Sequence, residues 1–300
     1  MTKRTLALLA ALGATTIYGL NHSIAKGVMP NYIGPFGFIL LRVLGATILF
    51  WGISFLGPRE KIEKKDWGRI VVCSIFGMAI NMLSFFKGLD LSTPINSSVL
   101  VTTTPIIVVV LSAFLIEEKI RLAKGMGILI GLAGALILVL YGNEIREDAP
   151  NIPLGNILFL VNALFFGLYL ILVKKLVDKY HPFTLMKWLF LIGIVLNLPV
   201  TLPEFMEISW AELPWEAIWK MAFVVVGTTF FTYLFNAYAL TQLKASTVSA
   251  FVYLQPLIGI VFAVISGRDS LNPVKTGAAI LVLIGVYLVS KKTRPNLGGA

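Results

Sequence analysis

Residues 36–52 read FGFILLRVLGATILFWG, an apolar run that contains one charged residue, Arg42. A membrane span needs about 20 mostly apolar residues, and this run supplies most of one. A charge at the centre of a bilayer costs a few kcal/mol or more. Arg42 must therefore be paired, bonded to backbone carbonyls or in contact with water, so this stretch predicts a membrane helix beside a polar interior.

The composition of the whole chain also indicates a membrane protein. Of its 300 residues, 57% are hydrophobic and 13% are charged, against about 45–50% and 25% in soluble domains. The formal net charge of +10 comes from basic residues in short segments between apolar runs, which argues against nucleic acid as a partner. The single cysteine, Cys73, lies in an apolar run and is expected to be a small buried hydrophobic residue.

Ten segments have the length and composition of membrane spans. They lie near residues 5–26, 33–56, 67–88, 92–116, 122–141, 153–176, 183–202, 217–240, 244–266 and 273–290. With the N-terminus inside, 17 Lys and Arg residues fall in inner segments and 6 in outer ones. Basic residues are enriched on the cytoplasmic side. Both termini are therefore predicted to be cytoplasmic, with the protein integral to a bacterial inner membrane.

Two segments resemble each other at a fixed offset of 151 residues. Residues 85–118 and 236–269 are identical at six of 34 positions, among them Pro105 and Pro256. A unit of five spans is odd in number, so the second copy enters the membrane from the opposite side. Inverted repeats are typical of secondary transporters, whose substrate site lies between the halves. The predicted fold is an all-α polytopic membrane protein with ten transmembrane helices in two inverted five-helix repeats. Its parts are a first repeat at 1–141, an outer connecting loop at 142–152, a second repeat at 153–290 and a cytoplasmic tail at 291–300.

Four stretches of the chain form a recognisable pattern. They are YGLNHSIAKG in the first span, Pro35, Phe36 and Arg42 in the second, the GLDLSTPINSSVL run that continues to Glu118, and ALTQLKASTVSAF in the second half. With these stretches the chain resembles the drug/metabolite transporter superfamily, in its EamA-type branch. The resemblance covers nearly the whole chain and implies transport of small metabolites. The second half departs from the pattern, because Arg268 and Asp269 stand where the first half ends in a glutamate.

The sequence lacks the motifs of common enzymes. It has no HExxH, GxSxG, Walker A or CxxC pattern, and its two histidines, His22 and His181, are too few for a multi-histidine metal site. No enzyme activity, metal or cofactor is predicted. All fifteen acidic residues lie in loops or at helix ends. Since proton-driven carriers commonly use an intramembrane acid or histidine, His22 is the candidate for direct proton coupling.

Polar side chains within the spans are predicted to line a substrate pathway, because such residues tend to face the bundle interior or a wet cavity. The candidates are Asn21, His22, Arg42, Asn81, Ser98, Asn162, Tyr169, Tyr233, Asn236, Ser249 and Tyr253. The alternative for any one of them is a hydrogen bond between helices, worth on average about 0.6 kcal/mol. As a set they predict a cavity of neutral hydrogen-bonding groups and aromatic rings.

Arg42 and the two mid-span prolines each admit more than one interpretation. For Arg42 there are three interpretations. It caps backbone carbonyls and so stabilises the bundle, or it faces the cavity and binds a substrate carboxylate, or it acts in a gate. Pro105 and Pro256 each free a backbone carbonyl one turn earlier. The resulting bend either improves packing only or lets half-helices move during alternating access.

These features predict a secondary, non-ATP transporter that works by alternating access. The resemblance favours export of amino acids or related zwitterionic and aromatic metabolites. A nucleotide sugar, a nucleobase or a drug is the alternative within the same fold, and a channel or lipid scramblase is the alternative of another class. The expected partners are a small-molecule substrate and the bilayer, with the chain a monomer or weak homodimer. The GxxxG pattern at Gly127 and Gly131 is expected to serve packing inside the bundle.

Overall fold

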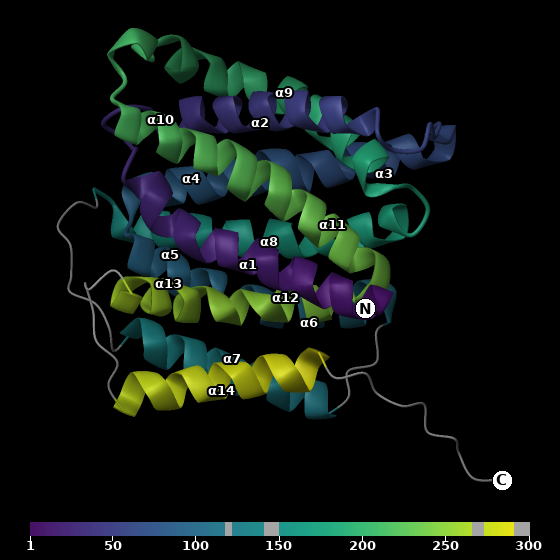
Figure 1. Cartoon of the computed structure of the whole chain (residues 1–300), viewed down its shortest axis with the longest axis vertical. Coiled ribbons are helices and arrows are strands. Elements are labelled where there is room, and N and C mark those ends of the chain that lie inside the picture. Colours follow the sequence, from purple (N-terminus) through teal and green to yellow (C-terminus); the bar gives the residue numbers. More distant parts are fainter. Residues whose placement is uncertain (118–121, 141–149, 266–272, 291–300) are drawn as a thin grey trace.

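The computed structural model describes residues 1–117, 122–140, 150–265 and 273–290, and these residues form helices joined by turns and loops (Figure 1). In the first half the helices are α1 (Lys3–Lys26), α2 (Pro35–Ser54), α3 (Trp67–Ser74), α4 (Asn81–Leu91), α5 (Pro94–Val101), α6 (Thr104–Ile116) and α7 (Leu122–Leu140). In the second half they are α8 (Ile152–Val177), α9 (Pro182–Met206), α10 (Trp215–Ala222), α11 (Thr232–Gln242), α12 (Ala245–Ala250), α13 (Leu254–Ile265) and α14 (Pro273–Ser290). Short 3-10 turns are η1 (Lys64–Asp66), η3 (Trp210–Glu212) and η5 (Phe251–Tyr253), and π-helical segments are η2 (Ile75–Ile80) and η4 (Phe223–Phe231).

The all-α prediction is confirmed within the described ranges, where no residue is in a strand. In the part of the chain that the structure describes, five continuous helical stretches are long and apolar enough to cross a membrane: Pro35–Ser54, Lys64–Leu91, Ile152–Val177, Pro182–Met206 and Trp215–Gln242. Helix also occupies the other five predicted segments, but the count of ten spans stays a prediction. The tail at 291–300, most of the loop at 142–152, and Glu118, Arg268 and Asp269 lie outside the described residues.

Two of the long helices change to π-helix near their middle. η2 joins α3 to α4, and η4 joins α10 to α11, with no break in the helical run. Applying the offset of 151 to η2 gives residues 226–231, which lie within η4. Short π-helical segments occur frequently at functional sites, where they shift backbone carbonyls and side chains relative to the α-helical pattern. The sequence pattern did not predict either of them.

Both mid-span prolines lie at interruptions of regular helix. Residues 102–103 form a turn between α5 and α6, and Pro105 stands in the first turn of α6. The 3-10 turn η5 precedes α13, in which Pro256 is the third residue. Proline is tolerated in a first turn because its missing N–H would have no helical partner there. A role for these interruptions in conformational change stays a prediction.

The helices pack as neighbours across the two halves (Figure 1). α2 lies beside α9 at one end of the bundle, α7 lies beside α14 at the other, and α1, α4, α8 and α11 form the centre. Within this centre α1 packs on α11, and α4 packs on α8. The central helices therefore bring residues of the first half against residues of the second.

Helices α2 and α9 are antiparallel, and each receives a carboxylate at its N-terminus from the region that follows the other. Glu204, near the end of α9, accepts hydrogen bonds from the backbone N–H groups of Phe36 and Gly37 at 2.7 and 3.0 Å. Glu60, in the loop after α2, accepts one from the N–H of His181 at 2.8 Å. A negative charge at a helix N-terminus is stabilising, and it satisfies N–H groups that have no partner in the helix.

A cluster of charges joins the loop after α2 to the loop before α9. Lys179 Nζ lies 2.6 Å from Glu63 Oε2 and 2.5 Å from Asp66 Oδ2, and the Tyr180 hydroxyl donates to Asp66. The hydrogen bond from the Lys179 ammonium lowers the pKa of Glu63, and bonds to Asp66 and Glu63 raise the pKa of Lys179. The pKa of Glu63 is lower in the folded state than in the unfolded state. Its contribution to the stability of the fold is therefore present above the unfolded pKa and is lost as the pH falls through the folded pKa.

Glycine allows the close approach of α7 and α14. A methyl group on Gly285 would lie 2.5 Å from the Cα atom of Gly131, and one on Gly127 would lie 2.8 Å from the Cβ atom of Leu288. The GxxxG pattern therefore serves packing inside the chain, as expected. Small residues at such contacts let helix backbones approach closely enough for dense packing.

We expect Gly285→Ala to lower the free energy of unfolding by about 1–3 kcal/mol, because the added methyl group overpacks the contact. Gly277 is the matched control, since it lies in the same helix and a methyl group there meets no atom within 4 Å. Gly277→Ala should be neutral or slightly stabilising, because alanine favours helix. Thermal unfolding of the detergent-solubilised variants measures both effects, and equal melting temperatures would contradict the packing argument.

Candidate functional site

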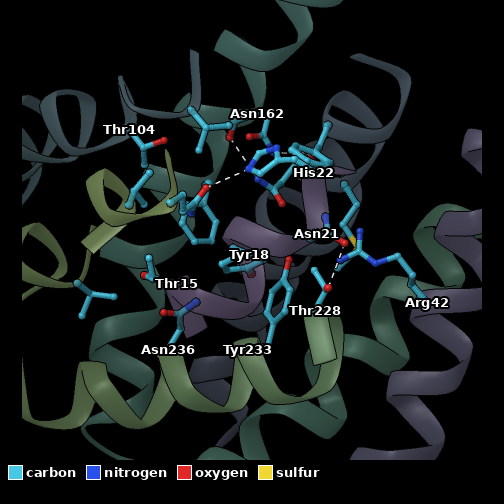
Figure 2. Close-up of a pocket in the computed structure, with 18 residues that line it drawn as sticks. Thr15, Tyr18, Asn21, His22, Arg42, Thr104, Asn162, Thr228, Tyr233 and Asn236 are labelled. Carbon is cyan, nitrogen blue, oxygen red and sulfur yellow. Dashed lines mark hydrogen bonds between the residues drawn. The ribbon is translucent and has the colours of Figure 1, made fainter. Parts of the chain in front are cut away.

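A polar cavity lies at the centre of the bundle, between α1, α2, α4, α8 and α11 (Figure 2). About 70 Å³ is open to the centre of a water molecule, several times what one water needs. Its lining residues come from both halves of the chain: Thr15, Tyr18, Asn21, His22, Arg42, Asn81, Met82, Phe85, Val101, Thr104, Asn162, Phe166, Thr228, Tyr233, Asn236, Val248, Val252 and Gln255. Arg42 is the only Lys, Arg, Asp or Glu among them.

The cavity brings together seven of the residues predicted from the sequence to line a pathway. They are Asn21, His22, Arg42, Asn81, Asn162, Tyr233 and Asn236. The other four, Ser98, Tyr169, Ser249 and Tyr253, are not part of the lining. The Tyr169 ring packs against Gly77, and the Tyr253 ring packs against Gly131, so both aromatic side chains fill contacts between helices. A transport role for any of these residues stays a prediction.

Arg42 enters the cavity from α2 and is 4% exposed. Its Nε donates to the Thr229 hydroxyl at 2.8 Å, and that hydroxyl donates to the Val224 carbonyl at 2.8 Å. The guanidinium carbon lies 4.5 Å from the centre of the Phe86 ring, a cation–π contact that is strengthened by burial. Within the described part of the chain, no carboxylate forms an ion pair with Arg42.

His22 is held between two helices by both of its ring nitrogens. Nδ1 lies 2.8 Å from the Ser97 hydroxyl on α5, and Nε2 lies 3.1 Å from Oε1 of Gln255 on α13. An amide oxygen accepts only, so Nε2 carries the proton. The Ser97 hydroxyl can donate to Nδ1 or accept from it. The site can therefore bind or release a proton at Nδ1 and keep both hydrogen bonds.

Other polar lining residues connect helices of opposite halves. The side-chain amides of Asn81 and Asn162 each donate to the other residue's backbone carbonyl, at 3.2 and 3.0 Å. The Thr228 hydroxyl donates to Oδ1 of Asn21 at 3.0 Å (Figure 2). The Tyr233 hydroxyl donates at 2.9 Å to the carbonyl of Gly77, which lies in the π-helical segment η2. These bonds hold the walls of the cavity in place.

Several lining residues form pairs at the offset of the sequence repeat. At 151 residues the pairs are Met82 with Tyr233, Phe85 with Asn236, Val101 with Val252, and Thr104 with Gln255. Eight of the lining residues are thus supplied by equivalent positions in the two halves. The cavity therefore lies where the two segments related by this offset face each other.

The sequence-based selection missed Gln255 and Ser97, the two partners of His22. Gln255 directly precedes Pro256 in an apolar run, and a long amide side chain there was the available signal. Ser97 was missed in favour of its neighbour Ser98. Successive residues of an α-helix point about 100° apart, so a choice between adjacent serines needs the rotation of the helix, which sequence does not provide.

We expect Tyr233→Phe to lower the free energy of unfolding by about 1 kcal/mol, because it leaves the carbonyl of Gly77 without its donor. Tyr253→Phe is the matched control. Its hydroxyl is also buried, but it forms no hydrogen bond within the described residues, so its removal should be neutral or stabilising. Thermal unfolding compares the two variants, and a larger loss for Tyr253→Phe would contradict the assignment.

Comparison with known proteins places the chain among transporters. The profile of the EamA-like transporter family matches twice, over residues 5–140 and 153–291. An uncharacterized transporter of Archaeoglobus fulgidus is 28% identical over 277 residues, which cover 92% of this chain and 96% of that protein. The uncharacterized transporter YoaV of Bacillus subtilis is 26% identical over 286 residues, 94% of this chain and 95% of that one.

Among solved structures, one protein crystal structure shares the fold with a TM-score of 0.74 at 17% identity, over 95% of this chain and 97% of that chain. The family profile covers most of the sequence, and the structure supplies the apolar helices of a membrane protein. This integral membrane protein belongs to the EamA-like transporter family.

Proposed function

We propose that this chain is a secondary transporter that moves small metabolites by alternating access, with no covalent step. The observation that carries the proposal is the central cavity, whose lining includes four pairs of equivalent residues from the two halves. In transporters built from inverted repeats, the substrate site lies between the repeats near the bilayer midplane. The cavity of this chain has the polar lining that such a site requires.

The proposal includes ten spans arranged as two inverted halves. Three observations support this arrangement. The family profile matches the chain twice, both halves contain a π-helical segment at the equivalent place, and α2 and α9 cap each other's N-termini as an antiparallel pair. The distribution of Lys and Arg supports two cytoplasmic termini in a bacterial inner membrane.

The lining of the cavity supports amino acids or related small metabolites as substrates. It combines amide and hydroxyl groups with the rings of Tyr18, Phe85 and Phe166. A nucleotide sugar, a nucleobase or a drug is the alternative within the same fold. Export is proposed because the family resemblance favours it.

We expect the purified protein in liposomes to catalyse counterflow. Vesicles preloaded with unlabelled leucine or phenylalanine should accumulate the labelled amino acid transiently, and the initial rate should saturate with concentration. A carrier exchanges substrate on both faces in turn, whereas a channel or scramblase lets flux run down the gradient without stimulation from the opposite side. Flux that neither saturates nor responds to preloading would contradict alternating access.

The variant Val101→Trp tests whether the cavity is the route. Val101 lines it, so an indole ring there should fill the space and reduce counterflow at least about tenfold. Val110→Trp is the matched control, because Val110 is 47% exposed on the surface of α6 and its change should leave counterflow unaltered. Equal rates in the two variants would exclude this cavity as the pathway.

A further inference from the structure

We propose that the cavity binds its ligand through a carboxylate, and that the guanidinium of Arg42 is the group that holds it. The inference rests on the proposed function only in taking the ligand to be a transported metabolite. The proposed ligand is a small molecule with one carboxylate, and Arg42 is the residue that binds this carboxylate.

A guanidinium has five N–H donors in a planar fork. In this structure Nε donates to Thr229, and neither terminal nitrogen forms a hydrogen bond to a described residue. Because Arg42 lines the cavity (Figure 2), this unused edge of the fork is available to a ligand. The pairing that uses two parallel N–H groups best is a bidentate contact with a carboxylate.

The rest of the guanidinium is held in place by neighbours that carry no charge. Thr229 is fully buried; its hydroxyl accepts the hydrogen bond from Arg42 and donates one to the carbonyl of Val224 in η4. Phe86 lies against the guanidinium carbon. A side chain fixed in this way loses little further freedom when it binds a ligand, which favours affinity.

The corresponding helix of the second half has no cation at this place. Helices α2 and α9 both begin with Pro-Phe, at Pro35 and Pro182. Aligning these two starts, rather than applying the offset of 151, makes Leu189 the counterpart of Arg42. Leu189 is fully buried, so an apolar side chain serves the equivalent position in the other half. A buried charge that the architecture does not need is most simply explained by a ligand.

The charge of the cavity selects the same class. The described residues that line it include one arginine and no Asp or Glu, so a cationic ligand would meet like charge and no counter-ion among them. A carboxylate would neutralise Arg42, whose burial without a partner is costly. Phe85, Phe166 and Met82 supply apolar surface for the remainder of the ligand.

The test uses ligands that share a body and differ in charge. Phenylalanine, 3-phenylpropionate and phenethylamine form one set, and leucine, 4-methylpentanoate and 3-methylbutylamine form the other. Binding to the purified full-length protein is measured by calorimetry and by the rise in melting temperature, which follows from binding to the native state. We expect a carboxylate of at least one set to bind and the matching amine not to bind. Comparison of the two acids within a set shows whether the ammonium is accepted.

Variants then separate anchoring from folding. Arg42→Gln removes the charge, Arg42→Leu copies the residue at Leu189, and Arg42→Lys keeps the charge without the fork. We expect Arg42→Gln and Arg42→Leu to weaken carboxylate binding at least about 30-fold, as for loss of a buried charge partner. The affinity of Arg42→Lys for the carboxylate should lie between that of these two variants and that of the wild type. Lys187→Gln is the control, because Lys187 lies near Trp51, does not line the cavity, and should bind as wild type.

Two results would overturn the inference: carboxylate binding that is unchanged in either uncharged variant that folds, or failure of every carboxylate to bind wild type. Counterflow in liposomes distinguishes a failure of this inference from a failure of the proposed function. An amine or nucleobase transported equally by wild type and Arg42→Gln would support the transporter function and contradict carboxylate binding by Arg42. Carboxylate binding that depends on Arg42, without any counterflow, would support carboxylate binding by Arg42 and contradict the transporter function.

Discussion

A chain that crosses a bilayer has to satisfy its buried polar groups from within, because the hydrocarbon core offers no water. This constraint explains many of the contacts between distant segments. Glu204 supplies acceptors for two N–H groups at the start of α2, and the ammonium of Lys26 donates to the carbonyls of Leu89 and Asp90 at the end of α4. In both cases the helix end is completed by a side chain from another helix, so the ends fix how the helices are placed.

The same constraint explains the side-chain hydrogen bonds at the two π-helical segments. A π-helical turn changes the pairing of backbone carbonyls, and carbonyls in both segments receive side-chain donors, among them Gly77 from Tyr233 and Val224 from Thr229. Thr229 also receives the hydrogen bond of Arg42. The groups that satisfy the irregular backbone are thus next to the groups that line the cavity. A change at either π-helical segment would move the walls of the site.

Much of this arrangement could be read from the sequence. Apolar length located the helices, and polar residues within apolar runs located seven lining residues, including Arg42 and His22. The rest depended on tertiary structure. The choice of Ser97 over Ser98 requires the rotation of α5, and the capping by Glu60 and Glu204 requires two helices to be antiparallel neighbours. The π-helical segments depend on packing and leave no periodicity of their own in an apolar sequence.

Three of the four paired lining positions carry different side chains in the two halves. Met82 and Phe85 in the first half are matched by Tyr233 and Asn236 in the second, and Thr104 is matched by the longer Gln255. The two halves place helices on both sides of the cavity, and their lining side chains decide the polarity of each side. At two of these pairs the first half supplies an apolar residue and the second a hydrogen-bonding residue, which breaks the equivalence of the two walls. Arg42, with Leu189 as its counterpart, breaks it most strongly, because it adds a charge at one point only. The two halves thus build the cavity from helices in corresponding positions, and the side chains that differ between them make its polarity asymmetric.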